Sequence, residues 1–180
     1  MVKISKLKNP NKFIIGIIIR YLVALLIAFP NLYLFYWIFT PLTVNLSSLF
    51  LSPFYSISTI GNTLIIDSLS IELIPACIAG SAYYLLVILN LLTPMSFKTR
   101  AKSLLFLTLT FLIINSIRIT IFSVLALNNY SYFDLAHKLV WTLGSTIFVI
   151  ILWFSSTIIF KIDKIPIYTD IRRIINAINN

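Results

Sequence analysis

The clearest indication of the fold class is the sequence SLLFLTLTFLIINSIRITIFSVLAL of residues 103–127, in which Arg118 is the single charged side chain. A helix that crosses the hydrocarbon core of a bilayer needs about 20 predominantly apolar residues. Three further segments meet this requirement, at 13–39, 78–93 and 139–160. The sequence therefore predicts an all-α integral membrane protein, a four-span helical bundle in which all 180 residues form one multi-pass domain.

The composition agrees with a membrane protein, because 59% of the residues are hydrophobic and only 11% are charged. Soluble domains have about 45 to 50% apolar and about 25% charged residues, so a soluble globule is excluded. The 14 Lys and Arg residues exceed the 5 Asp and Glu residues, but no basic stripe or recognition motif for nucleic acid accompanies them. We therefore expect the basic excess to set orientation in the membrane, with no nucleic acid among the partners.

Twelve of the 14 basic residues fall on one side of the four predicted spans when Arg20, near the inner end of the first span, is included. The other eleven are Lys3, Lys6, Lys8, Lys12, Lys98, Arg100, Lys102, Lys161, Lys164, Arg172 and Arg173. The positive-inside rule makes that side cytoplasmic. Both termini, including a tail at 161–180, are then cytoplasmic, while Arg118 and Lys138 belong to the outer half.

The segment at 40–77 is expected on the outer face. A fifth span between about 41 and 60 would export the basic residues at 98–102, and prolines and many Ser and Thr residues interrupt it. An interfacial or shallow re-entrant segment is therefore favoured. Within it, apolar and polar residues alternate over 69–73, and 63–66 precedes them across a turn-compatible pair, which predicts a small hairpin.

Cys77 is the only cysteine, which excludes an intrachain disulfide, a CxxC pair and a thiolate metal cage. With a single histidine in the chain as well, we expect neither a metal nor another cofactor. Pro75 places Cys77 on the first turn of a helix, where unpaired amides and the helix dipole favour a thiolate. The alternative is a small buried packing residue, a common environment for a free cysteine.

Arg118 lies nine residues before the outer end of its span, about 13 Å below that end at 1.5 Å per residue. A charge at that depth is costly, so intramembrane arginines are candidates for a functional role. Asn115, one turn earlier on the same face, is placed to orient the guanidinium. Alternatively, Arg118 extends to the outer headgroups or pairs with Asp134 or Glu72.

His137 opens the last span, and Asp134 is expected to cap that helix, which makes His137 its third residue. A cation is disfavoured there, so the imidazole is expected to be neutral and able to accept a proton. The alternative is an interfacial histidine without a function. The topology brings Cys77, Arg118 and His137 to the outer half on three helices, which favours a nucleophilic enzyme.

In this interpretation Cys77 attacks a peptide carbonyl, His137 transfers the proton to the leaving amine, and Arg118 stabilises the thiolate or the oxyanion. Asp134, one turn from His137, is a possible orienting group. Three other classes remain. They are a transporter subunit that binds an anion through Arg118, an assembly partner without chemistry, and, less favoured because no GxSxG element exists, an intramembrane serine protease.

The sequence from Pro75 to Tyr83, the Asn-Ser-Ile-Arg box that ends at Arg118 and His137 at the head of the last span together resemble the exosortase and archaeosortase family. The resemblance covers about residues 61–160, and its Pro-Ala-Cys start and small size look most like the pacearchaeosortase branch. It departs at Ile78, where many relatives have threonine.

The resemblance implies a membrane cysteine transpeptidase that acts on the outer face of the cell membrane. Its partners would be exported proteins with a C-terminal sorting signal composed of a motif, a hydrophobic span and a basic tail. A thioester on Cys77 would then be released by an amine, such as a membrane lipid headgroup, or by water.

Overall fold

The structure, a computed structural model, describes residues 10–67 and 69–163. Most of the predicted tail at 161–180 therefore lies outside the described residues. The elements in chain order are α1 (Pro10–Ala28), α2 (Tyr33–Leu51), β1 (Ile57–Ile60), β2 (Thr63–Ile66), β3 (Leu69–Glu72), α3 (Pro75–Ile78), α4 (Gly80–Leu92), α5 (Phe97–Leu127), α6 (Phe133–Leu139), η1 (Val140–Gly144) and α7 (Ser145–Ile159).

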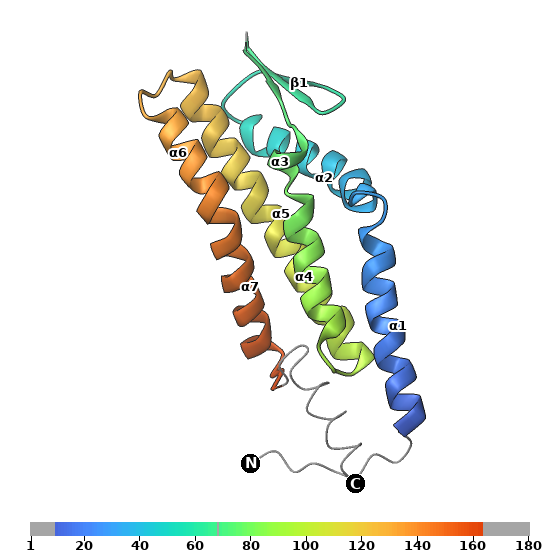
Figure 1. The fold of residues 1–180 in the computed structure, drawn as a ribbon. Helices are drawn as coiled ribbons and strands as arrows, with labels where there is room; N and C mark the ends of the chain where they lie inside the picture. Colours follow the sequence, from blue (N-terminus) through green and yellow to red (C-terminus); the bar gives the residue numbers. More distant parts are fainter. Residues whose placement is uncertain (1–9, 68, 164–180) are drawn as a thin grey trace.

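Four helical segments of the described chain are long and apolar enough to cross a membrane, as expected for a membrane protein. They are Tyr33–Leu51, Pro75–Leu92, Phe97–Leu127 and Phe133–Ile159. Figure 1 shows α1, α4, α5 and α7 running side by side along the bundle, whereas α2 crosses one end of it, beneath the strands. We call this the sheet end. The assignment of the sheet end to the outer face stays a prediction.

The single helix predicted at 13–39 is wrong, because the chain breaks between Ala28 and Tyr33. Pro30 has no amide hydrogen to donate, and Asn31 and Leu32 both adopt positive φ angles, which a continuing helix does not allow. The apolar run continues through this break, so the hydrophobicity of the sequence alone does not indicate where the helix ends. The second half becomes α2, which extends well into the segment that we expected to start at residue 40.

The predicted pairing of 63–66 with 69–72 is present, and β1 adds a third strand, giving the order β1-β2-β3. Both pairs are antiparallel, with Ile60 opposite Thr63 and Ile66 opposite Leu69. Leu64 and Ile66 of β2 are fully buried, because that face of the sheet packs with Val44 and Leu51 of α2. The sheet therefore closes the end of the bundle and leads directly into α3.

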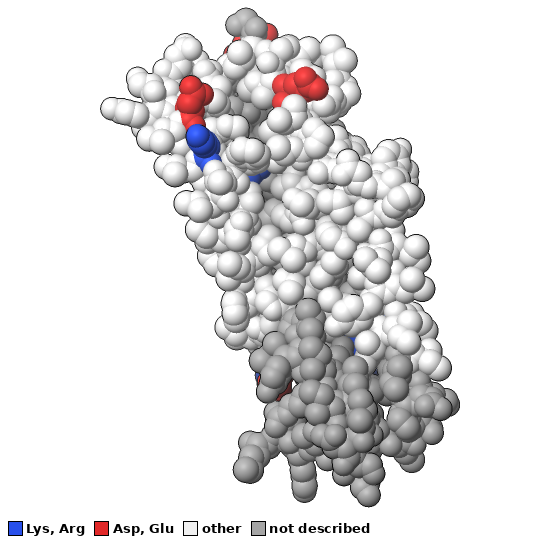
Figure 2. Space-filling view, in the orientation of Figure 1, with Lys and Arg blue, Asp and Glu red and all other residues white. Residues whose placement is uncertain are grey.

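Arginines bind the last carbonyls of α4 at the opposite end of the bundle. Arg100 donates to the carbonyl oxygens of Asn90 and Leu91, both at 2.7 Å, and Arg20 donates to that of Leu92 at 3.4 Å. Cations are favourable at a helix C-terminus, where carbonyls lack helical partners. Figure 2 shows a long middle region of the bundle without charged side chains on the face in view. Arg20 and Arg100 thus lie at one end, as the charge pattern predicted.

Candidate active site

The site begins with a break in the predicted second span. α3 is a single turn that ends at Ile78, and Ala79 has a left-handed conformation with φ of 59° before α4 starts at Gly80. A Cβ atom on Gly80 would lie 2.7 Å from two ring carbons of Tyr36, so only glycine allows α2 to approach this closely. Cys77 does lie on a first helical turn, but that helix is too short for the dipole argument made from the sequence.

Two side chains of α5 donate hydrogen bonds to the carbonyl groups that this break leaves without helical partners. Asn115 Nδ2 donates to the Cys77 carbonyl oxygen at 3.0 Å and to that of Ile78 at 3.4 Å. Arg118 Nη2 donates to the same Cys77 oxygen at 3.2 Å. Asn115 is buried and Arg118 is half-buried. Asn115 and Arg118 therefore act together on the backbone of Cys77, whereas we expected Asn115 to orient the guanidinium.

Ser145, at the start of α7, is a partner of Arg118 that sequence reasoning missed. Its Oγ accepts a hydrogen bond from Arg118 Nη1 at 3.1 Å, so the guanidinium is held between α3 and α7. The described structure does not support the alternative partners of Arg118. Asp134 forms no ion pair with it there, and Glu72 instead accepts a hydrogen bond from Asn62 at 3.4 Å.

His137 is the fifth residue of its helix rather than the third, because α6 starts at Phe133. Tyr132 occupies the N-cap position without a side-chain cap, so the predicted capping by Asp134 is wrong. The imidazole instead stacks on the ring of Phe133, with centroids 5.5 Å apart and planes 8° apart, and it meets the edge of Phe122 at 5.1 Å. Aromatic contacts therefore position His137, which lies in the last turn of this seven-residue helix and not at its N-terminus.

The helix that carries His137 contains a π-helical turn, η1, between α6 and α7. π-Helical turns are rare in proteins as a whole, but those that occur are often found at functional sites. They rotate the following side chains relative to an α-helix. Here Val140 and Trp141 both line the cavity beside Cys77. The predicted span at 139–160 had no feature that distinguished this turn from an ordinary helix.

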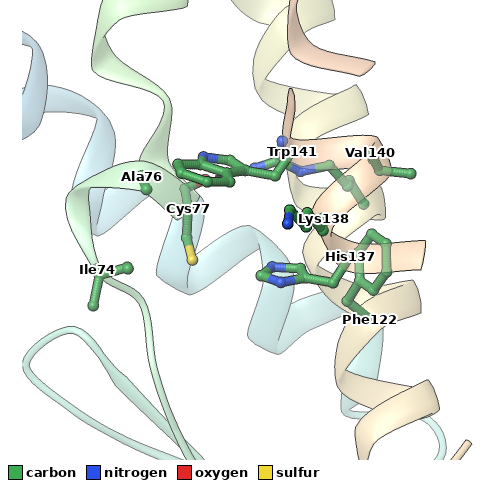
Figure 3. Close-up of a pocket in the computed structure, with 9 residues that line it drawn as sticks. Ile74, Ala76, Cys77, Phe122, His137, Lys138, Val140 and Trp141 are labelled. Carbon is green, nitrogen blue, oxygen red and sulfur yellow. Dashed lines mark hydrogen bonds between the residues drawn. The ribbon is translucent and has the colours of Figure 1, made fainter. Parts of the chain in front are cut away.

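A cavity of about 320 Å³ opens between α3 and the α6–η1 segment. It is lined by Ile74, Ala76, Cys77, Arg118, Phe122, His137, Lys138, Val140 and Trp141. Figure 3 shows the sulfur of Cys77 and the imidazole of His137 facing one another across this space, with the indole of Trp141 beside them. The structure thus brings Cys77, Arg118 and His137 to one cavity, together with a second cation, Lys138, and no carboxylate of the described residues lines it.

A second cavity of about 390 Å³ lies on the other side of Ala76 and Trp141, which line both spaces. Hydroxyl groups are common in its wall, which includes Tyr36, Ser81, Thr142, Ser145 and Thr146. Since Ser145 binds Arg118, the guanidinium lies where the two spaces meet. The region around Cys77 therefore offers an apolar compartment with cations and a neutral polar compartment.

Comparison of the chain with protein-family models, with characterised proteins and with solved structures finds no match to any of them. Within the described residues, no three His, Cys, Asp or Glu side chains are grouped closely enough to hold a metal ion.

Proposed function

We propose that the protein is a membrane-embedded cysteine peptidase or transpeptidase, with Cys77 as nucleophile and His137 as general acid and base. The observation that carries this proposal is the cavity in which the sulfur of Cys77 faces the imidazole of His137. A nucleophile and a base that approach one another from different helices across a cavity large enough for a reacting group are typical of acyl transfer.

In the first half of the proposed reaction, His137 accepts the thiol proton and the Cys77 sulfur forms a bond to the scissile carbonyl carbon. The resulting tetrahedral oxyanion collapses, the carbon–nitrogen bond breaks, and the imidazolium returns its proton to the leaving amine. A thioester on Cys77 remains. In the second half, an amine or water loses a proton to His137 and attacks the thioester, and the thiolate leaves and recovers that proton.

Arg118 is proposed to stabilise negative charge on the sulfur and on the oxyanion. Its bonds to the Cys77 carbonyl and to Ser145 fix the guanidinium beside the reacting residue before substrate arrives. Charge held in advance in a site with little water is worth more than the same charge in solvent. Because these bonds go to neutral protein oxygens, the positive charge stays available for an anion formed in the reaction.

The substrate class follows from the family resemblance and is part of the proposal. Exported proteins with a C-terminal sorting signal would be cleaved on the outer face, and the new carboxyl end would pass to a lipid amine or to water. Among the described residues, Arg118 and Lys138 line the cavity and no carboxylate does, which also suits the transporter alternative, in which the cavity holds an anion. Replacement of Cys77 distinguishes the peptidase from the anion-binding transporter subunit.

The test compares exported proteins from cells that carry the wild-type chain, Cys77→Ala or Ser81→Ala. Ser81 lines the second cavity and serves as the matched control for loss of a small polar atom. We expect the substrate to keep its full-length C-terminal mass in cells with Cys77→Ala and to be cleaved in cells with Ser81→Ala. A hydroxylamine-sensitive adduct of substrate mass on Cys77 would identify the thioester. Normal processing by Cys77→Ala would refute the enzyme and favour the anion-binding subunit.

A further inference from the structure

The strand that leads to Cys77 has a free edge. β3 pairs only with β2, because the strand order is β1-β2-β3. The Leu73 amide donates to the Asn62 carbonyl at 2.9 Å, which extends the β2–β3 register by one hydrogen-bonded pair. Along an antiparallel ladder, hydrogen-bonded pairs alternate with pairs that are not hydrogen-bonded. The backbone groups of Ser70 and Glu72, which are in pairs of the second kind, therefore point away from β2.

Within the described chain, no further strand pairs with this edge. β1 and β2 contact α2, whereas β3 has no comparable contact with a helix, and both Ser70 and Glu72 are exposed. Edge strands are usually protected by proline, lysine or a bulge, because they recruit other extended chains. β3 is short and carries one charge, Glu72, but it has neither proline nor lysine in Leu69–Glu72, so its outward donors and acceptors can pair with another strand.

The free edge ends at the cavity of the candidate site. Ile74 continues the extended conformation, with φ of −68° and ψ of 163°, and it lines the same cavity as Cys77. At about 3.3 Å per strand residue, the edge from Ser70 to Ile74 is about 13 Å long. The Cys77 amide then donates to the Ile74 carbonyl at 2.8 Å, so the nucleophile is one turn beyond the strand. Figure 3 shows this passage from Ile74 to Cys77.

We propose that an extended segment of the protein substrate adds to β3 as a fourth strand, which delivers the scissile bond to Cys77. The outward amide and carbonyl groups of Ser70 and Glu72 bind the main chain of the segment, and its alternate side chains point to the two faces of the sheet. Strand addition takes most of its affinity from main-chain hydrogen bonds and its specificity from pockets for alternate side chains. This inference rests on the proposed function, because it names how that substrate binds.

Proline substitution at the two free edges provides a matched test. Proline at an outward position removes one edge donor but no bond of the existing ladder. The Asp67 amide donates to the Ser56 carbonyl at 3.1 Å, so the same alternation directs Thr59 outward on β1, the edge remote from Cys77. We expect Ser70→Pro to lower substrate processing about 10-fold, as for loss of one hydrogen bond, and Thr59→Pro to leave it unchanged. Equal effects of the two variants at equal membrane levels would overturn the inference.

A second measurement separates binding from catalysis. A photoreactive benzoylphenylalanine is placed at Ser70 or at Thr59 in the Cys77→Ala chain, and the adducts formed in cells are sequenced by mass spectrometry. Attachment at Ser70, but not at Thr59, of the C-terminal segment of an exported protein supports the inference even if the wild-type chain cleaves nothing, in which case only the proposed function fails. If Ser70 captures no more than Thr59, strand addition is refuted, even where Cys77-dependent cleavage is intact.

Discussion

The hydrogen bonds of Asn115 predict that Asn115→Ala impairs processing more than its effect on stability would explain. The substitution removes both bonds from Nδ2, to the carbonyl oxygens of Cys77 and Ile78. The Cys77 oxygen keeps its bond from Arg118, whereas the Ile78 oxygen loses its donor. A nucleophile whose backbone shifts by about 1 Å reacts up to about 10²-fold more slowly, so we expect a 10- to 100-fold fall in the processing rate.

The expected cost in stability follows from the same two bonds. A buried polar group left without a partner costs about 1 to 3 kcal/mol, while hydrogen bonds between membrane helices average about 0.6 kcal/mol and reach about 1.7 kcal/mol. Asn115 is only 2% exposed, so water does not readily replace its amide. We therefore expect Asn115→Ala to lose about 1 to 2 kcal/mol of unfolding free energy.

Asn90→Ala is the matched control. Asn90 is 1% exposed, and its Nδ2 also makes two bonds, at 3.0 Å to Ser103 Oγ and at 3.5 Å to the Arg100 carbonyl. It lies 13 residues beyond Cys77, near the far end of α4. Thermal unfolding of the purified variants in detergent and substrate processing in membranes are measured in parallel. Similar losses of processing in the two variants at similar stability would refute the positioning role of Asn115.

Three further outcomes are expected. Arg118→Lys keeps the charge but cannot reproduce two divergent hydrogen bonds, so processing should fall about 10²- to 10³-fold at a normal membrane level; near-normal processing would reduce Arg118 to a general electrostatic role. Reporters fused after Arg100 and after Asn128 should read cytoplasmic and outside, and an outside reading at the first would invert the topology. Gly80→Ala should lower the unfolding free energy by about 1 to 3 kcal/mol, because its methyl meets the tyrosine ring of α2. Gly16→Ala, with open space around the added Cβ atom, should not lower it.

The sequence predicted those parts of the fold that depend on apolar length and alternation. The third long helix ends at Leu127 as predicted, and the strands at 63–66 and 69–72 pair as the alternation indicated. It did not predict the break at Pro30, because the surrounding apolar residues satisfy the requirement for a span whether or not the helix is continuous. Hydropathy indicates which residues can lie in lipid, but it does not indicate where the backbone changes direction.

The details of the site were less predictable because they depend on tertiary contacts. Cys77, Arg118 and His137 were selected for their residue types and depth, and they do line one cavity. The partners that hold them were not predictable in this way. Ser145 is a partner of Arg118 from a helix 27 residues further along the chain, and His137 is positioned by rings that lie 15 and 4 residues earlier.

The break after Ile78 gives Arg118 a structural role in addition to its proposed chemical role. A buried carbonyl without a donor costs about 1 to 3 kcal/mol, so donors from α5 are needed at the level where α3 ends. Asn115 and Arg118, three residues apart on one helix face, supply them. Loss of activity on replacing Arg118 alone would therefore not separate transition-state stabilisation from support of the Cys77 backbone. The comparison of Arg118→Ala with Asn115→Ala helps to separate them, because asparagine donates to the same carbonyl without a charge. A larger loss for Arg118→Ala favours stabilisation of negative charge by the guanidinium, and equal losses favour support of the backbone.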